Sequence, residues 1–405
     1  MTTNNFYGLN IAPKILETIE RLKFTVPTPI QFKTIPTAIE GKDIIGIAQT
    51  GTGKTLAFAI PMVQRLSQTN GRGLVLVPTR ELAIQVNETF LKIGSVFGMR
   101  SAVIIGGAPM FAQIQELKRK PRVIIATPGR LMDHMERRTV NLSDVSVLVL
   151  DEADRMLDMG FLPQIRQILR QVPKEKQTML FSATIPSEIV GVANAYMKLP
   201  IHVEVAPTGT MADGIEQELY IVRKEAKLKL LGKVLEKYHG SVLLFSRTKS
   251  GARRIVKAVK DMRHSAAEIH SDRSLGQRRE ALEGFKSGRY RVLVATDIAA
   301  RGIDVIGIEL VINFDLPEDP ENYVHRIGRT GRAGKEGRAI AFATPDQGSD
   351  VKNIERLIRN TLPVSDHPDL PKETFIRAPA PRIGFIGRGG GRRGGAHFRR
   401  RPGLR

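Results

Sequence analysis

The stretch DIIGIAQTGTGKTLAFAIPMVQRL, residues 43–66, decides the fold of the first half of this chain. Residues 44–48 form an apolar, β-branched run typical of a buried strand, and the residues from Leu56 on are typical of a helix. Between them, AQTGTGKT at residues 48–55 fits the pattern G-x-x-x-x-G-K-[ST], with Ala48 in place of the first glycine. Backbone N–H groups wrap the phosphate in such a loop, so this departure matters little. A strand, a glycine-rich loop and a helix in this order predict a nucleotide site in an α/β domain.

The same loop supplies most of the expected nucleotide contacts. We expect Lys54 to reach the β- and γ-phosphates of ATP and the Thr55 hydroxyl to bind Mg²⁺. The other loop residues predicted to bind ATP are Ala48, Gln49, Thr50, Gly51, Thr52 and Gly53.

A second apolar run, VSVLVL at residues 145–150, is followed directly by the acidic motif DEAD at residues 151–154. Such a run predicts a central strand buried on both faces, with the acidic motif at its carboxyl end. We expect Asp151 to hold Mg²⁺ and Glu152 to polarise a water for attack on the γ-phosphate. Taken alone, the motif could also be an acidic turn that caps the following helix.

The organisation of the chain indicates two domains. Short β-branched runs alternate with helical stretches over residues 35–205 and again over 215–371, which predicts two α/β domains with parallel sheets. Residues 1–34 form an N-terminal segment, and residues 206–214 are rich in small residues and predict a short flexible linker. Two such domains favour a ligand in the cleft between them.

The charge and composition of the chain indicate which kind of molecule it binds. The chain of 405 residues carries 62 Lys and Arg against 41 Asp and Glu, and the tail at residues 372–405 is rich in Arg and Gly, which predicts disorder. Both body and tail therefore favour a polyanion, most simply nucleic acid, with a solubility device as the alternative. The tail is expected to add non-specific RNA affinity, unless it is a solvated segment without a dedicated partner.

Other classes are disfavoured by what the sequence lacks. The chain has no Cys, which excludes disulfide frameworks, thiolate zinc sites and a Cys nucleophile. It has no apolar run of about 18 residues and no signal-peptide core at its start, so we expect a cytoplasmic protein.

With these motifs in this order, residues 6 to about 345 resemble the DEAD-box ATP-dependent RNA helicases of superfamily 2, most closely the short bacterial RhlE-type members. The resemblance implies two tandem RecA-like domains, ATP and Mg²⁺ as cofactors, and RNA bound largely through its backbone. FTVPTPIQ, residues 24–31, is similar to the adenine-reading Q motif of the family. This implies ATP contacts from Phe24, from Gln31 at an adenine edge and from Phe6 over the base. The family usually has Gly where this chain has Lys23.

Several further motifs resemble the family's RNA-binding elements, among them PTRELA (residues 78–83), TPGR (127–130) and LLFSRT (243–248). The resemblance implies RNA contacts from Pro78, Thr79, Arg80, Gly106, Gly107, Thr127, Pro128, Gly129, Arg130, Arg247, Thr248, Arg278 and Thr296. At position 275, where the family usually has Gln, this chain has Leu275, which predicts a weaker grip on RNA.

The second half has no P-loop of its own, so it is expected to complete a site rather than form one. HRIGRTGR, residues 325–332, resembles the family's final motif. The resemblance implies that Arg329 and Arg332 are arginine fingers and that Arg326 contacts the acidic motif of the first domain. It further implies Asp304 on the ribose and Asp315 in an interdomain contact. The residues implied in coupling hydrolysis to strand separation are Asp154, Ser182, Ala183, Thr184, His325 and Arg326.

These motifs predict RNA-stimulated ATP hydrolysis that drives local unwinding of short RNA duplexes. The alternative is an ATP-gated RNA clamp or annealing chaperone in which hydrolysis only times release. A DNA-translocating helicase is less favoured, because RNA is the family's substrate. Ribosome-assembly or RNA-decay proteins are possible partners, and a monomer is the default expectation.

Overall fold

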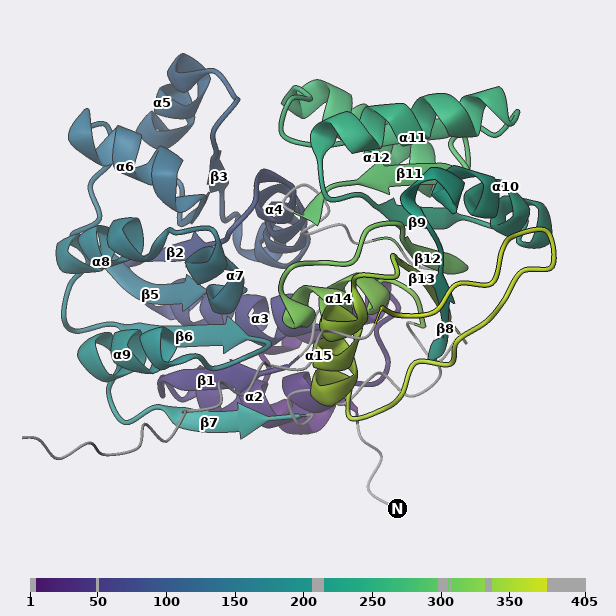
Figure 1. The fold of residues 1–405 in the computed structure, drawn as a ribbon. Coiled ribbons are helices and arrows are strands. Elements are labelled where there is room, and N and C mark those ends of the chain that lie inside the picture. Colours follow the sequence, from purple (N-terminus) through teal and green to yellow (C-terminus); the bar gives the residue numbers. More distant parts are fainter. Residues whose placement is uncertain are drawn as a thin grey trace, which may run out of the picture.

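The computed structural model describes residues 5–48, 51–205, 215–297, 305, 308–331 and 337–376. Within these ranges the chain forms two α/β domains, each a parallel sheet with helices on both faces (Figure 1). This confirms the predicted fold class. The predicted linker at residues 206–214 and the tail from residue 377 on lie outside the described residues.

The first domain contains a seven-stranded sheet in the order β3-β4-β2-β5-β6-β1-β7, with every pair parallel. Its strands are β1 (Ile44–Ile47), β2 (Arg72–Leu76), β3 (Ser101–Ile104), β4 (Val123–Ala126), β5 (Val145–Leu150), β6 (Gln177–Ser182) and β7 (Ile201–Glu204). One face is covered by α1 (Pro13–Arg21), α2 (Pro29–Ile39), α3 (Lys54–Gln68) and α4 (Arg80–Gly94), with η1 (Phe6–Leu9) and η2 (Ser95–Phe97) nearby. The other is covered by α5 (Met110–Lys118), α6 (Pro128–Glu136), α7 (Ala153–Asp158), α8 (Leu162–Gln171) and α9 (Ser187–Tyr196).

Strand pleating explains why the central strands of this sheet are mostly apolar. Successive side chains point to opposite faces, so Ile44 packs under α1–α4 while Ile45 packs under α5–α9. All positions of β4 and β6 are therefore buried, on one face or the other.

The second domain contains a six-stranded parallel sheet in the order β10-β11-β9-β12-β13-β8. Its strands are β8 (Ile215–Ile221), β9 (Val242–Phe245), β10 (Ala266–Ile269), β11 (Val292–Ala295), β12 (Leu310–Asn313) and β13 (Gly337–Ala343). One face packs against α10 (Lys227–Lys237) and α11 (Lys249–Asp261), with η3 (Lys224–Ala226) leading into α10. The other packs against α12 (Leu275–Lys286), α14 (Pro320–Ile327) and α15 (Gly348–Ile358).

The two sheets have the same strand topology. Strands β8 to β13 take the places that β1 to β6 take in the first sheet, and β7 is an addition beside β1. In both domains the loops at the carboxyl ends of the strands face the region between the domains, which is where open α/β sheets bind ligands.

The packed part of the second domain extends beyond its predicted end at residue 371. Leu219 of β8 pairs with Val364, the Ile376 backbone N–H donates to the Pro345 carbonyl at 2.8 Å, and Phe375 packs beside α15. The prediction of disorder is therefore wrong for residues 372–376. No helix in the described ranges is both long and apolar enough to cross a membrane.

Lys23 adopts the backbone conformation expected of the glycine it replaces, because its φ is +61°. A left-handed backbone costs a non-glycine residue about 1 kcal/mol. We therefore predict that Lys23→Gly raises the free energy of unfolding of the first domain by about 1 kcal/mol, measured by urea titration. Glu88→Gly, at an exposed position in the interior of α4, is the matched control and should lower it by about the same amount. A less stable Lys23→Gly variant would contradict this explanation.

Candidate nucleotide and RNA sites between the two domains

The glycine-rich loop connects β1 to α3 as the sequence predicts. Gly51 and Gly53 have φ near +90°, a conformation that disfavours any other residue, and α3 begins at Lys54. The Lys54 ammonium is buried and donates to the Ala48 carbonyl at 2.9 Å, so it lies inside the curve of the loop. Thr55 follows at the second position of the helix. Gln49 and Thr50 lie outside the described residues.

Gln31 links the start of α2 to this loop. Its side-chain oxygen accepts from the Thr28 backbone N–H at 2.9 Å, and its side-chain nitrogen donates to the Gly53 carbonyl at 3.0 Å. Both ends of the amide are thus used within the protein, whereas the resemblance implied a bond to adenine. Phe6 is buried in the core beside α1–α4, and Phe24 is exposed. The base contacts of these residues stay predictions.

The acidic motif begins directly after β5, next to the loop. Asp151 and Glu152 are 2% and 5% exposed, and Glu152 has a φ of +51°. Burial raises the pKa of Asp151 to about 7, with the Glu152 carboxylate adding to the rise and Lys54 opposing it. A left-handed backbone at a non-glycine residue is strained, and such strain clusters at functional sites.

Glu152 is held by cations from both domains. Its carboxylate accepts a hydrogen bond from the buried Arg155 guanidinium at 2.8 Å. Burial alone would raise the pKa of Glu152, but Arg155, Lys54 and Arg329 together hold it below its ordinary value. Arg329 belongs to the second domain, so the charge of Glu152 is stabilised across the domain boundary.

Asp154 joins the acidic motif to the segment after β6. Its carboxylate accepts from the backbone N–H groups of Ala183 and Thr184 at 2.9 and 3.0 Å and from the Thr184 hydroxyl at 3.3 Å. The Ser182 hydroxyl in turn accepts from the Asp154 backbone N–H at 3.1 Å. The predicted coupling residues of the first domain therefore form one hydrogen-bonded unit.

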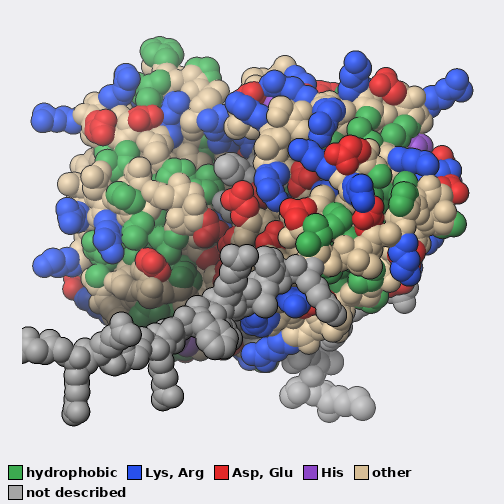
Figure 2. Space-filling view, viewed as in Figure 1, with side chains coloured by type: hydrophobic (Ala, Val, Ile, Leu, Met, Phe, Trp, Pro, Cys, Tyr) green, Lys and Arg blue, Asp and Glu red, His purple; other side chains and the backbone are tan. Residues whose placement is uncertain are grey.

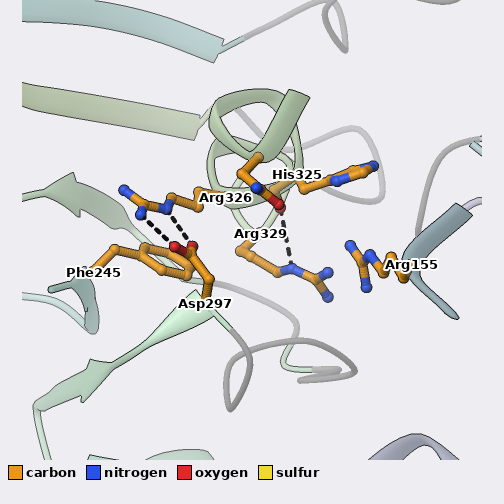
Figure 3. A pocket seen from close by; sticks show the side chains of 7 residues that line it. Arg155, Phe245, Asp297, His325, Arg326 and Arg329 are labelled. Atoms are coloured by element: carbon orange, nitrogen blue, oxygen red, sulfur yellow. Dashed lines mark hydrogen bonds and ion pairs between the residues drawn. The ribbon is translucent and has the colours of Figure 1, made fainter. Parts of the chain in front are cut away.

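The second domain presents its final motif toward Arg155 of α7 from α14 and the turn after it (Figure 3). Arg329 is buried and points toward Arg155, and its guanidinium Nε donates to the His325 carbonyl at 3.3 Å. Burial and the nearby cations Arg155 and Arg329 lower the pKa of His325 well below its usual value, so this imidazole is neutral. Arg332 lies outside the described residues.

Arg326 does not contact the acidic motif of the first domain, and that expectation is wrong. Its guanidinium forms a two-pronged ion pair with Asp297 at 2.6 and 2.7 Å and lies over the ring of Phe245 at 5.0 Å (Figure 3). It also donates to the Asn313 side chain at 2.9 Å. These partners all belong to the second domain, so Arg326 fixes α14 to the strand ends beneath it and leaves Arg155 to pair with Glu152.

A cleft of about 530 Å³ between the domains gathers most of the predicted RNA-binding residues. The predicted residues that line it are Pro78, Thr79, Arg80, Gly106, Gly107, Thr127, Gly129, Arg130 and, from the second domain, Arg278. Pro128 lies buried between two of them at the start of α6. The glycine pair packs against the Arg80 side chain, and a Cβ on Gly107 would overlap that guanidinium. Figure 2 shows basic side chains on both sides of the upper boundary between the domains.

Arg278 pairs with a first-domain carboxylate instead of standing free for a phosphate. Its guanidinium donates to the Glu81 side chain at 2.9 Å, and both side chains are buried. Leu275, one turn earlier on α12, packs against the apolar cluster of the first domain. The position that the sequence interpreted as a lost hydrogen bond therefore makes an apolar contact that joins the domains.

This ion pair allows a direct test of domain closure. Arg278→Gln should lower RNA-stimulated ATP turnover by about 10- to 100-fold, because closure would then bury an unpaired Glu81 carboxylate, at a cost of about 1.5–3 kcal/mol. Adding Glu81→Gln should recover part of the loss, since two amides can bond each other. Steady-state hydrolysis of the two single variants and the double variant measures this coupling. Strictly additive losses would show that the pair does not control closure.

The other described residues of the second domain that were predicted to bind RNA, or to contact the first domain, do not line the interdomain cleft. Arg247 and Thr248 line a separate pocket within the second domain, and Asp315 lies there too, paired with Lys227 at 3.3 Å rather than with the first domain. Thr296 follows β11, where its backbone N–H donates to the Ile269 carbonyl at 3.3 Å. Asp304 lies outside the described residues.

Sequence reasoning missed three residues of this region. Arg155 directly follows the acidic motif, Glu81 lies inside the PTRELA motif, and Ser271 lines the interdomain cleft from the second domain. The i,i+3 spacing of Glu152 and Arg155 was a usable signal for that pair, whereas no spacing along the chain indicates that Glu81 meets Arg278 or that Ser271 reaches the cleft.

Comparison with known proteins agrees with this geometry. A sequence model described as "DEAD/DEAH box helicase" matches residues 28–191, and one described as "Helicase conserved C-terminal domain" matches residues 226–334. The chain is 44% identical over 374 residues to the ATP-dependent rRNA helicase RRP3 of Candida albicans, covering 91% of this chain and 70% of that protein. It is also 44% identical over 373 residues to the DEAD-box ATP-dependent RNA helicase CshA of Bacillus cereus, covering 91% of this chain and 71% of that protein.

Solved structures give the same result for the fold. The S. cerevisiae Dbp5 structure bound to RNA and ADP BeF3 matches with a TM-score of 0.81 and 31% identity, over 89% of this chain and 95% of that one. The structure of the DEAD-box helicase Mss116 bound to ssRNA and UDP-BeF matches with a TM-score of 0.81 and 29% identity, over 89% of this chain and 79% of that one.

Proposed function

The chain belongs to the DEAD/DEAH box helicase family, and from that membership we propose that it is an ATP-dependent RNA helicase that hydrolyses ATP when RNA is bound and locally unwinds short duplexes. The single observation that carries this proposal is the shared environment of Glu152. Lys54 and Arg155 approach it from the first domain and Arg329 from the second, so the hydrolytic group is fully surrounded only when the domains are closed.

The phosphates of ATP fit the loop between β1 and α3. Lys54 would exchange its bond to the Ala48 carbonyl for the β- and γ-phosphates, and Gly51 and Gly53 leave room for backbone N–H groups to face them. The Thr55 hydroxyl and the Asp151 carboxylate are the hard oxygen donors that Mg²⁺ prefers. Mg²⁺ would neutralise the phosphate charge.

Glu152 is placed to orient the attacking water, because its carboxylate stays charged among cations while it is buried. Arg329 would stabilise the charge that develops on the γ-phosphate, with Arg332 as the second finger by resemblance. Hydrolysis by this arrangement depends on positioning and electrostatics.

RNA is proposed to bind in the interdomain cleft through its phosphates. Arg80 and Arg130 supply positive charge there. Helices α4 and α6 both begin at the cleft, so the backbone N–H groups of their N-terminal turns are available to bind phosphate. Closure, which buries the Glu81–Arg278 pair beside this cleft, would let RNA and ATP favour the same state. Residues 377–405 are proposed to add RNA affinity through their nine Arg side chains.

The proposal is tested by strand displacement on a short RNA duplex with a single-stranded extension. We expect separation that requires ATP and is lost in Lys54→Ala. A protein that binds the RNA and hydrolyses ATP without separating strands would instead be the clamp or annealing chaperone.

A further inference from the structure

A second basic pocket lies in the second domain, apart from the interdomain cleft. It encloses about 570 Å³ and is lined by four cationic side chains, Lys224, Lys227, Arg247 and Arg254, and by the two carboxylates of Asp315 and Asp346. A pocket of this volume is large enough for a small ligand or a few atoms of a polymer backbone.

The position of this pocket in the sheet matches that of the nucleotide site in the first domain. Because β8 takes the place of β1, Lys227 at the start of α10 corresponds to Lys54 at the start of α3, and both are buried. Asp315, shortly after β12, corresponds to Asp151 after β5. The second domain thus repeats the lysine and carboxylate of a phosphate site at the carboxyl edge of its sheet.

The loop between β8 and α10 differs in a way that decides the kind of ligand. Residues 222–226 read VRKEA and contain no glycine, whereas Gly51 and Gly53 of the first loop have positive φ. This loop cannot wrap its backbone N–H groups around a terminal phosphate as the first loop can. Recognition in this pocket would come from side chains, which suits the single charges of a phosphodiester chain.

The Asp315 carboxylate of the pocket is already paired, and two of the pocket's four cations are not. Asp315 accepts from the Lys227 ammonium at 3.3 Å and from the Arg247 backbone N–H at 3.0 Å. The Arg247 guanidinium donates to the Leu316 carbonyl at 3.3 Å. Lys224 and Arg254 are exposed, and no ion pair involves either of them within the described part of the chain, whereas their neighbours Arg223 and Arg253 are paired. With four cationic side chains against two carboxylates, the pocket presents a net positive charge to an anion.

The chain leaves the second domain at the rim of this pocket. The Ile376 backbone N–H bonds to the carbonyl of Pro345, which is adjacent to Asp346, and the segment after α15 runs beside β8 and α10 in Figure 1. The residues that follow, 377–405, carry nine Arg and no acidic side chain. A basic tail cannot neutralise a basic pocket, so both features favour the same polyanion.

We propose that this pocket is a second RNA site, in which Lys224 and Arg254 bind backbone phosphates of a single strand that extends out of the interdomain cleft. This rests on the proposed function, since it assumes that RNA is the strand in that cleft. The site would hold the flanking part of the RNA strand on the second domain while the strand in the interdomain cleft is being unwound.

The test is RNA binding by the full-length double variant Lys224→Ser/Arg254→Ser. Its matched control is Lys257→Ser/Lys286→Ser, which removes two exposed charges from the same domain outside the pocket. Two RNAs are titrated at several salt concentrations with a non-hydrolysable ATP analogue: the shortest strand that still stimulates hydrolysis, and that strand extended at both ends. We expect the double variant to bind the extended strand several-fold more weakly, with a salt slope smaller by about 1 for each lost contact. Binding of the short strand and the control variant should be unchanged.

Three results would overturn the proposal. These are wild-type binding of the extended strand by the double variant, equal losses in variant and control, or equal losses on the short and extended strands. A loss of affinity for ADP or inorganic phosphate alone would assign the pocket to a free phosphate compound instead. Failure of RNA to stimulate hydrolysis by the wild-type protein would count against the proposed function, and it is measured separately.

Discussion

Glu152→Gln should lower RNA-stimulated ATP turnover by about 10² to 10⁴, the usual contribution of a positioned general base, while ATP binding persists. The amide has nearly the shape of the carboxylate but cannot polarise a water by its charge. The structure supports this role because the carboxylate is buried and yet stays charged through Arg155, Lys54 and Arg329.

Two measurements separate this effect from a loss of structure. Affinity for a fluorescent ATP analogue should stay within a few-fold of wild type, and Glu175→Gln, at an exposed carboxylate, should hydrolyse ATP normally. Turnover within a factor of about 3 of wild type in Glu152→Gln would mean that another group orients the water.

Arg329→Ala should lower RNA-stimulated turnover by about 10³ or more, the range found for arginine fingers. The residue comes from the second domain and acts on the charge of Glu152 in the first, so its removal should affect the closed state alone. Arg329→Lys should restore little of the activity, because a lysine cannot present the planar fork of the guanidinium.

The control for this variant is Arg356→Ala, at an exposed position of α15 in the same domain. It should leave turnover unchanged. If Arg329→Ala lowered the RNA-independent rate as much as the RNA-stimulated one, Arg329 would support the fold of α14 rather than complete the site.

The parts of this molecule that were predicted correctly depend on local sequence. An apolar run followed by glycines or acidic residues indicates a strand end, and parallel strands place all such ends at one edge, so the positions of Lys54, Asp151 and Ser182 follow from the pattern. The alternation of apolar runs with helical stretches predicted two α/β domains, and the resemblance to a family ordered the motifs within them; the structure confirms the two-domain fold.

The sequence could not predict which hydrogen-bonding or ion-pair partner each buried polar side chain would take. Arg326 was expected to contact the acidic motif of the first domain and Arg278 to contact RNA. A buried guanidinium must be satisfied by whichever acceptors lie within reach, which are Asp297 of the same domain for Arg326 and Glu81 of the first domain for Arg278. The packing of α14 and α12 decides which carboxylate each arginine reaches. No spacing along the chain reveals this packing. Gln31 is a similar case, because its amide is used to hold the loop at Gly53.

The central claim is that RNA closes the two domains around ATP. It is tested most directly by steady-state ATP hydrolysis with and without single-stranded RNA, using a DNA strand of the same sequence as the control. Strong stimulation by RNA and little by DNA is the expected result. Hydrolysis that is independent of RNA, or that responds equally to DNA, would contradict the account even if the phosphate loop binds ATP as described.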